Sequence, residues 1–148
     1  MSVKALGHVV LKVRDLAVSL PFYRDVLGLH EVARYGHNMV FFSLGTNHHD
    51  LALMALGADA PVPSPDSVGL YHVAFKVGDS LDELRAMRDH LLQQGVPVLG
   101  MSDHTVSQSL YIRDPDGIEI ELYVDADPGL WRDNPQAVAS IRPLDLGG

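Results

Sequence analysis

The chain has 148 residues and contains no cysteine. That absence excludes disulfide frameworks, thiolate zinc sites and iron–sulfur clusters, and it fits a reducing compartment, so we expect a cytoplasmic protein. No apolar run reaches the ~18 residues of a membrane span, and no signal-like segment is visible at the start. Basic residues are also few: 11 Lys and Arg stand against 19 Asp and Glu, a net charge of −8. Nucleic acid and anionic membranes are therefore not expected partners.

The length predicts a single domain, residues 1–148, which folds without a structural metal. The order of expected elements indicates one βαβββ unit used twice, an α+β fold with half-modules at about 5–57 and 69–125 and a C-terminal tail at 126–148. In the first half we expect a strand at 5–13, a helix at 16–27 and strands at 30–35, 38–44 and 49–55. In the second half we expect a strand at 70–77, a helix at 81–94 and strands at 96–100, 107–113 and 118–124.

Residues suited to helix ends mark both expected helices. Asp15 can cap the start of the first helix and Gly28 can end it, while Asp79 or Ser80 and then Gly95 serve the second. The stretch 57–69 between the halves contains three prolines in alternate positions, which is typical of a stiff linker. Two half-sheets of this kind are expected to join around a shared concavity.

Two histidines occupy the same place in the repeat. His8 lies in Gly-His-Val-Val-Leu-Lys-Val and His72 in Tyr-His-Val-Ala-Phe-Lys-Val. A single histidine in an apolar strand is more often a buried structural side chain than a ligand, but two at equivalent positions favour a metal site. A carboxylate near the chain's end could join them. Glu119 and Glu121 alternate with apolar residues and so share one face of a strand, and spacing alone does not choose between them.

Together these residues resemble the vicinal oxygen chelate superfamily, which includes glyoxalase I, fosfomycin-resistance enzymes, bleomycin-binding proteins and extradiol dioxygenases. The resemblance covers about residues 5–125 and implies paired βαβββ units that form a half-barrel around a metal. It also implies that the metal ligands are His8, His72 and Glu121, because the family's carboxylate stands four residues after the glycine of an Asp-Pro-x-Gly turn, here Gly117. Two histidines and one carboxylate leave open positions, which suits a ferrous ion.

Two further stretches are similar to the single-module form of the type I extradiol dioxygenases. His49 matches an active-site histidine that precedes an apolar strand in that family, and His104 and Tyr111 match its ring-cleavage signature before Asp114-Pro115-Asp116-Gly117. The resemblance implies that His49 exchanges a proton and stabilises negative charge on oxygen, because a histidine pKa lies near working pH. It implies that His104 and Tyr111 hydrogen-bond the diol or its ring-opening product. His48 is expected to be only a solvent-facing neighbour.

The expected function is therefore iron(II)-dependent, catechol 2,3-dioxygenase-like cleavage of an aromatic ortho-diol with O2, in an assembly that is at least a homodimer. One alternative is a glyoxalase-like isomerase or lyase, or a glutathione or thiol transferase, on the same scaffold with Mn²⁺, Ni²⁺ or Zn²⁺. Isomerases of this kind often take a fourth ligand from the first half, where 49–55 offers no glutamate. The other alternative is a non-catalytic drug-binding module, although such proteins generally lack the metal set. The tail around Trp131–Pro135 either folds across the pocket mouth or packs on the surface.

Overall fold

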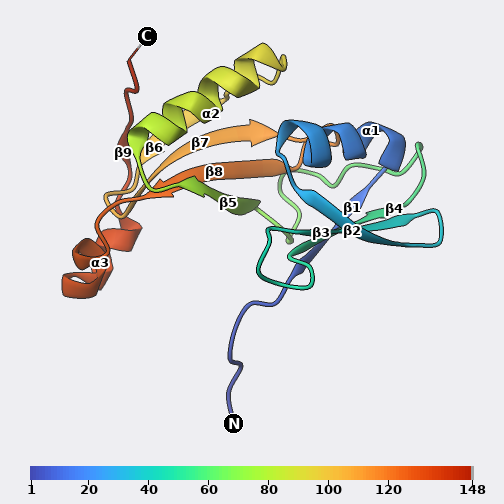
Figure 1. Ribbon diagram of the computed structural model, residues 1–148, viewed down its shortest axis with the longest axis horizontal. Coiled ribbons are helices and arrows are strands. Elements are labelled where there is room, and N and C mark those ends of the chain that lie inside the picture. Colours follow the sequence, from blue (N-terminus) through green and yellow to red (C-terminus); the bar gives the residue numbers. More distant parts are fainter. Residues whose placement is uncertain (148) are drawn as a thin grey trace. The chain divides into compact units, whose positions relative to one another are not determined.

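The structure is a computed structural model that describes residues 1–147, so that Gly148, the end of the expected tail, lies outside the described residues. The chain divides into two compact units, Met1–Pro65 and Asp66–Gly148, and the boundary falls inside the expected proline-spaced linker. Each unit contains one βαβββ repeat, which confirms the α+β class and the paired-unit architecture (Figure 1). The expectation of a single domain around a shared concavity stays a prediction.

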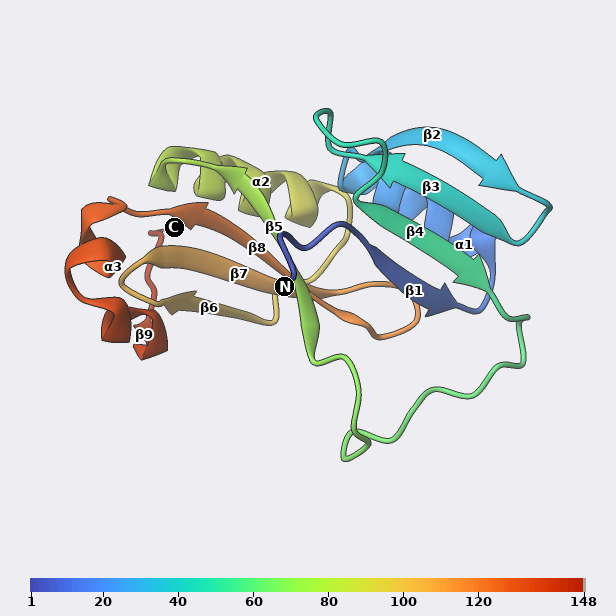
Figure 2. The same cartoon turned by 90° about the horizontal axis from the view of Figure 1, so that it is seen from below.

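The first unit is a four-stranded sheet with one helical segment against one face (Figure 2). Its strand order is β1-β4-β3-β2, with β1 parallel to β4 and the other pairs antiparallel. The elements are β1 Val9–Val13, α1 Leu16–Leu20, η1 Pro21–Val26, β2 His30–Tyr35, β3 Met39–Ser43 and β4 Leu51–Ala55. Buried Leu11, Val40, Phe42, Leu51 and Leu53 form the core of this sheet.

The helix that the sequence predicts at 16–27 is interrupted. Asp15 does cap its start, since its Oδ1 accepts from the Ala17 amide at 2.8 Å, but α1 ends at Leu20 and a π-helical turn follows. Pro21 has no amide hydrogen to continue the ladder, and the bonding shifts to a five-residue spacing, with the Leu27 amide donating to the Phe22 carbonyl at 2.9 Å. Gly28 then ends the segment with φ +76°, a left-handed conformation that favours glycine.

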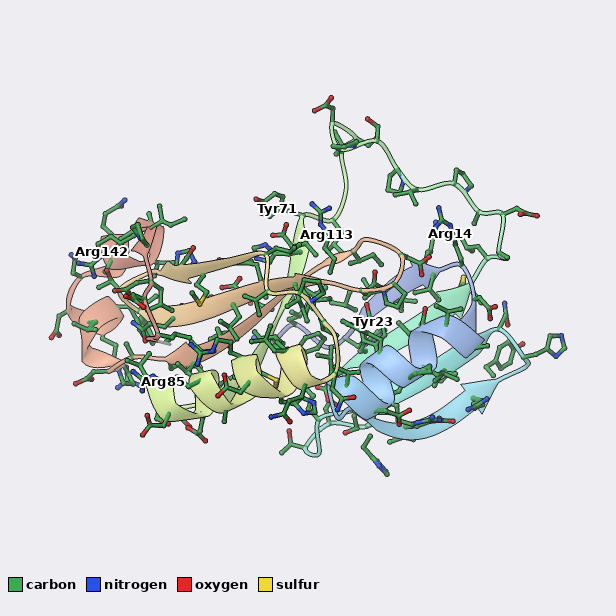
Figure 3. The ribbon with its side chains drawn as sticks, turned by 90° about the horizontal axis from the view of Figure 1, so that it is seen from above. Arg14, Tyr23, Tyr71, Arg85, Arg113 and Arg142 are labelled. Atoms are coloured by element: carbon green, nitrogen blue, oxygen red, sulfur yellow. The ribbon has the colours of Figure 1, made fainter. Side chains whose placement is uncertain are left out.

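The second unit repeats this plan and extends it. The strand order is β5-β8-β7-β6-β9, with β5 parallel to β8. The elements are β5 His72–Gly78, α2 Leu81–Gln93, β6 Gly100–Asp103, β7 Ser107–Arg113, β8 Glu119–Asp125, α3 Gly129–Asp133, η2 Pro135–Ala139 and β9 Arg142–Pro143. Helix α2 packs against β5, β7 and β8, and it buries Leu84 and Leu91 there. Arg85 on α2, labelled in Figure 3, donates a hydrogen bond to the Leu146 carbonyl at 2.9 Å and so holds the segment around Leu146 against this helix.

In this unit the structure settles one alternative that the sequence left open and corrects one predicted strand. Ser80, not Asp79, caps α2, because its Oγ accepts from the Glu83 amide. The strand predicted at 96–100 is wrong: β6 begins only at Gly100, because Pro97 has no amide hydrogen for a ladder bond and Val96 still donates to Leu91 in the helix end. Within residues 1–147, no helix is long and apolar enough to cross a membrane.

Candidate metal and ring-cleavage site

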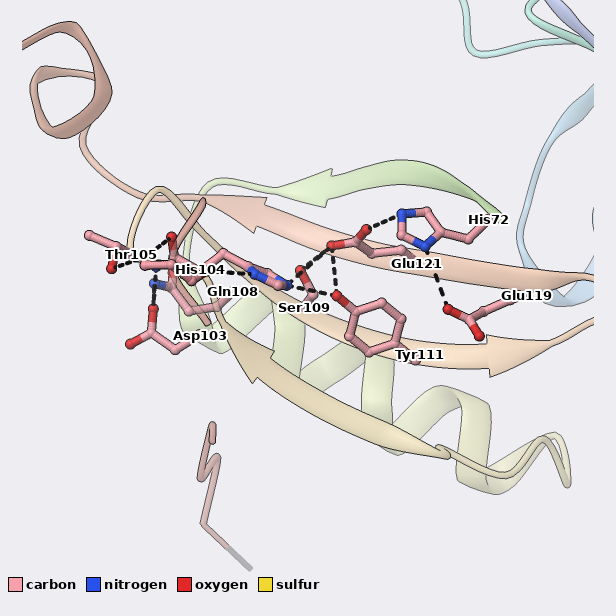
Figure 4. Close-up of polar contacts among 10 residues, drawn as sticks. His72, Asp103, His104, Thr105, Gln108, Ser109, Tyr111, Glu119 and Glu121 are labelled. Atoms are coloured by element: carbon pink, nitrogen blue, oxygen red, sulfur yellow. Dashed lines mark hydrogen bonds and ion pairs between the residues drawn. The ribbon is translucent and has the colours of Figure 1, made fainter. Parts of the chain in front are cut away.

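The second unit exposes a polar face of its sheet opposite α2. Strands β7 and β8 alternate strictly, so Leu110, Ile112, Ile120, Leu122 and Val124 are buried in the core. Their neighbours point to the opposite face, as alternate strand residues must. That opposite face carries His72, Ser109, Tyr111, Glu119 and Glu121 (Figure 4). A group of hydrogen-bonding and ionisable side chains gathered on one sheet face is the pattern of a binding site rather than of a core.

His72 lies between the two carboxylates that the sequence could not separate. Its Nε2 is 3.0 Å from Glu121 Oε2, and its Nδ1 is 3.5 Å from Glu119 Oε1 (Figure 4). The two glutamates therefore do share a face, as the alternation predicts, and they meet opposite edges of one imidazole. Among the described residues, His72 Nδ1 is buried and has no hydrogen-bond partner at normal length. The closest group able to accept from it is the carboxylate of Glu119.

Glu121 is held in place from β7. Its side chain is nearly buried, and Oε1 accepts a hydrogen bond of 2.5 Å from the Ser109 hydroxyl. The Tyr111 hydroxyl stands farther away, at 3.4 Å from the same oxygen. Burial, and then the charge of Glu121, raise the pKa of Tyr111 to about 12. Tyr111 therefore stays protonated at neutral pH and presents a hydrogen-bond donor to this face.

His104 completes the polar group from the turn after β6. Its Nε2 is 2.7 Å from the Tyr111 hydroxyl and its Nδ1 is 3.0 Å from the Ser140 carbonyl oxygen in the tail. The structure thus brings His104, Tyr111, Glu121 and His72 into one connected row across four segments of the second unit (Figure 4). The roles that the resemblance implies for these four residues stay predictions.

The first unit contributes a separate cluster of histidines. His8 directly precedes β1, and the His49 ring lies 4.2 Å from it, centroid to centroid. His48 is exposed, as expected of a solvent-facing neighbour, and its Nδ1 lies 2.6 Å from that of His49. Desolvation, and then the nearby His8 and His48, lower the pKa of His49. Phe41 on β3 stacks its edge against His49, with ring centroids 5.4 Å apart.

The donor set of the second unit fits a divalent transition metal. Two adjacent ligands, each about 2.1 Å from one ion, stand about 3.0 Å apart in octahedral geometry, and the His72 Nε2 to Glu121 Oε2 separation is 3.0 Å. Imidazole with carboxylate suits Fe, Mn, Ni and Zn. No group of three or more His, Asp or Glu side chains forms a metal-binding arrangement within the part of the chain that is described. His8 belongs to the other unit, so its membership of a three-residue site with His72 and Glu121 stays a prediction.

Sequence reasoning missed two residues of this site, Ser109 and Ser140, and one contact, that of Glu119 with His72. Ser109 was detectable, because it lies two positions before Tyr111 and must share its strand face. The contact of Glu119 with His72 needed the strand pairing, in which His72 lies opposite Glu119. Ser140 carried no signal in the sequence, since only the path of the tail brings its carbonyl to His104.

Known proteins resemble this chain along most of its length. The model of the Glyoxalase/Bleomycin resistance protein/Dioxygenase superfamily matches residues 5–122. "Biphenyl-2,3-diol 1,2-dioxygenase 3" of Rhodococcus globerulus is 39% identical over 124 residues, which are 81% of this chain and 63% of that protein. "Iron-dependent extradiol dioxygenase" of Rhodococcus jostii is 33% identical over 136 residues, 80% of this chain and 42% of that protein. The chain thus spans less than two thirds of the length of these relatives.

Two other similarities concern proteins closer in length. "Metallothiol transferase FosB" of Lysinibacillus sphaericus is 29% identical over 126 residues, 83% of this chain and 84% of that protein. A solved structure of a glyoxalase/dioxygenase from Nostoc punctiforme superposes with a TM-score of 0.68 at 22% identity, covering 86% of this chain and 99% of the other. That structure supports the fold, while the names of the sequence relatives describe enzymes of more than one type, dioxygenases and a thiol transferase.

Proposed function

Because the chain belongs to the Glyoxalase/Bleomycin resistance protein/Dioxygenase superfamily, we propose that it is an iron(II)-dependent extradiol dioxygenase. Its substrate would be an aromatic ortho-diol, which it opens with O2. The observation that carries this proposal is the connected row of His104, Tyr111 and Glu121 on one sheet face. A metal site alone would serve any member of the superfamily, but a histidine–tyrosine pair beside the metal carboxylate is suited to holding a diol.

The metal would be held by His72 and Glu121, with His8 as the proposed third ligand. Iron(II) bound there would supply positive charge that polarises the diol oxygens and a template for diol and oxygen. The names of two relatives, a biphenyl-2,3-diol dioxygenase and an iron-dependent extradiol dioxygenase, support this choice of metal and substrate class.

Tyr111 and His104 would bind the diol. Tyr111 keeps its proton at neutral pH and can direct it to His104 Nε2, 2.7 Å away, so its hydroxyl oxygen can accept a hydrogen bond from a diol hydroxyl. The pair would therefore orient the diol and offer its proton a route toward His104.

His49 would exchange a proton with the oxygen that is being reduced. Its lowered pKa keeps the imidazole neutral at pH 7, so one ring nitrogen can accept a proton. Its position next to His8 is the support for this role, because His8 is the proposed ligand from the same unit. His48, in contact with His49 but exposed, is assigned no part in this step.

Oxygen uptake tests the proposal. The chain loaded anaerobically with Fe²⁺ should consume one O2 per diol when offered catechol or 2,3-dihydroxybiphenyl, and it should yield a yellow ring-opened product. Tyr111→Phe should slow this turnover about 10²-fold or more, the contribution typical of a group that handles a proton. The matched control is Tyr123→Phe, which removes a tyrosine hydroxyl two residues after Glu121 on the same sheet face and should have a much smaller effect. Full iron occupancy with no oxygen uptake on any diol would overturn the proposal.

A thiol transferase is the second candidate, and one observation favours it: the chain covers 84% of the metallothiol transferase, against 63% of the biphenyl-diol enzyme. Metal preference and substrate separate the two. A transferase would bind Mn²⁺, Zn²⁺ or Ni²⁺ in preference to Fe²⁺ and would consume a thiol without oxygen.

The proposed homodimer or larger assembly is measured in the same preparation by light scattering.

A further inference from the structure

We propose that the C-terminal segment, residues 129–143, is part of the site: it sets the tautomer and orientation of His104, with Ser140 as the positioning residue. The consequence for turnover rests on the proposed dioxygenase function, whereas the structural effect on His104 does not. The segment contains α3, η2 and β9, which lie at one end of the second unit's sheet (Figure 2). The sequence left open whether the tail around Trp131–Pro135 folds across the pocket mouth or packs on the surface, and it did not single out Ser140.

The tautomer follows from what each partner can do. The Ser140 carbonyl, 3.0 Å from His104 Nδ1, can only accept a hydrogen bond. In the neutral imidazole the hydrogen therefore lies on Nδ1 and the lone pair on Nε2. That lone pair is 2.7 Å from the Tyr111 hydroxyl, so Tyr111 donates to His104.

This arrangement decides where the single hydroxyl hydrogen of Tyr111 points. Glu121 Oε1 is the competing acceptor, at 3.4 Å, and it already accepts the Ser109 hydroxyl. With the opposite tautomer, His104 would present an N–H to Tyr111, and the tyrosine hydrogen would turn to Glu121. The tail carbonyl thus keeps Tyr111 from donating to the proposed metal carboxylate.

The Ser140 side chain fixes the carbonyl in place. Its Oγ lies 2.8 Å from the His104 carbonyl oxygen, 2.7 Å from Thr105 Oγ1 and 2.8 Å from the Ala137 carbonyl oxygen. A hydroxyl has one hydrogen to donate, so it serves one carbonyl at a time and accepts from Thr105. Ser140 therefore contacts both the backbone and the ring of His104 and ties them to the tail.

The turn that carries His104 is strained and is held from the same side. Thr105 has φ +71°, an unusual value for a β-branched residue. Its amide donates to Asp103 Oδ1 at 2.8 Å, and Arg142 of β9 reaches Asp103 Oδ2 at 3.2 Å and Thr105 Oγ1 at 3.3 Å (Figure 3). Strained residues persist where surrounding contacts hold them, and they cluster at functional sites. The tail supplies those contacts here.

Nitrogen-15 NMR of the imidazole rings tests the proposal directly, with the His104 signal assigned by its loss in His104→Gln. The unsubstituted chain should show His104 with the hydrogen on Nδ1 alone, in protein free of paramagnetic metal. Ser140→Ala should give a mixture of tautomers, and Ser140→Thr, which keeps the hydroxyl, should restore the single form. Val138→Ala on the same segment is the control and should change nothing. If Ser140→Ala fails to fold, Arg142→Gln at an exposed position takes its place. It should also give a mixture of tautomers, with a smaller fraction of the second form.

Kinetics then connect the tautomer to the reaction. In the iron-loaded chain, Ser140→Ala should lower kcat about 10-fold, the low end for loss of a partner that orients a site residue, while iron occupancy and the KM for O2 stay unchanged. Ser140→Thr should recover most of kcat. An unchanged tautomer in both Ser140→Ala and Arg142→Gln would overturn the inference even if the chain cleaves diols. A shifted tautomer in a chain that cleaves no diol would support the inference and overturn the proposed function.

Discussion

The two βαβββ units share a backbone plan, yet their open sheet faces differ in chemistry. In the first unit, the parallel pair β1 and β4 places Val10 opposite Ala52. In the second, the equivalent pair β5 and β8 places Ala74 opposite Glu121. Val10 and Ala74 each stand two residues after the repeated histidine, His8 or His72. Ala52 therefore occupies in the first unit the place that Glu121 occupies in the second. The repeat keeps the histidine in both units and the carboxylate in only one.

The difference shows how a repeated unit produces an asymmetric site. The open face of the first unit is mostly apolar, with Met39, Phe41 and Met54 on it, while that of the second holds the row of hydrogen-bonding groups. In the place of the second unit's Glu121 the first unit has alanine, so this position offers no second carboxylate to the proposed metal site.

The largest expected effect comes from removing the carboxylate that only the second unit has. Glu121→Ala, or His72→Ala beside it, should abolish diol-dependent oxygen uptake and lower metal affinity at least ~100-fold, since even partners of metal ligands typically contribute 10–100-fold. Elemental analysis after dialysis against a weak chelator measures the metal, and circular dichroism checks the fold. His8→Ala should act in the same way if the first unit supplies the third ligand. Full iron stoichiometry in all three variants would contradict the assignment.

The next effect concerns the histidine cluster found only in the first unit. His49→Gln keeps a similar size and some hydrogen bonding but cannot carry a proton near neutral pH. Turnover should therefore fall by ~10²–10⁴-fold, the contribution typical of a general acid–base group, with near-normal iron and diol binding. His48→Gln is the matched control and should cost much less. If His49→Gln loses its metal instead, His49 is a ligand and the glyoxalase-like alternative gains.

A third experiment makes the two faces alike. Ala52 is fully buried, so Ala52→Glu should destabilise the metal-free chain by about 3 kcal/mol or more, the cost of a buried unpaired charge. Added Zn²⁺ should restore much of that stability, because the new carboxylate can join the metal, and oxygen uptake with Fe²⁺ should fall as an open position is filled. Thermal unfolding with and without metal measures both effects. Ala52→Gln is the control, and metal-independent destabilisation in Ala52→Glu would show that Ala52 does not reach the ion.

The smallest effect compares the helix caps of the two units. Ser80→Ala and Asp15→Ala should each lower the free energy of unfolding by about 1 kcal/mol, measured by urea denaturation. Only the second cap includes a titrating partner: hydrogen bonds from the Asp79 amide and then the Ser80 hydroxyl lower the pKa of Glu83 from 4.5. A lowered pKa stabilises the fold above the unfolded value and loses that effect as pH falls through the folded one. The stability difference between Glu83→Gln and the unsubstituted chain should therefore shrink below about pH 4.5.

Much of the fold could be predicted because it follows from local rules. Strand alternation, the Asp15 cap and the glycines at 28 and 95 each act within a few residues, and all are present in the structure. The unbroken helix predicted at 16–27 and the strand predicted at 96–100 both failed at a proline whose missing amide hydrogen moved the element's boundary. The first strand, predicted at 5–13, begins only at Val9, so His8 lies just before it. The grouping of His104, Tyr111, Glu121 and His72 was also predictable, through the resemblance to a known family.

What the sequence determined by itself is the repeat, with a histidine at the same place in each half, and the face on which Glu119 and Glu121 lie, because these depend on the residue pattern and on the two-residue period of a strand; the choice of Glu121 as a candidate ligand came from the resemblance to a known family. Only the tertiary structure decided that both glutamates flank one imidazole, that Ala52 takes the place of Glu121 in the first unit, and that the tail reaches His104. These relations join residues as far apart as 104 and 140. They depend on strand pairing and chain path, and no local pattern carries that information.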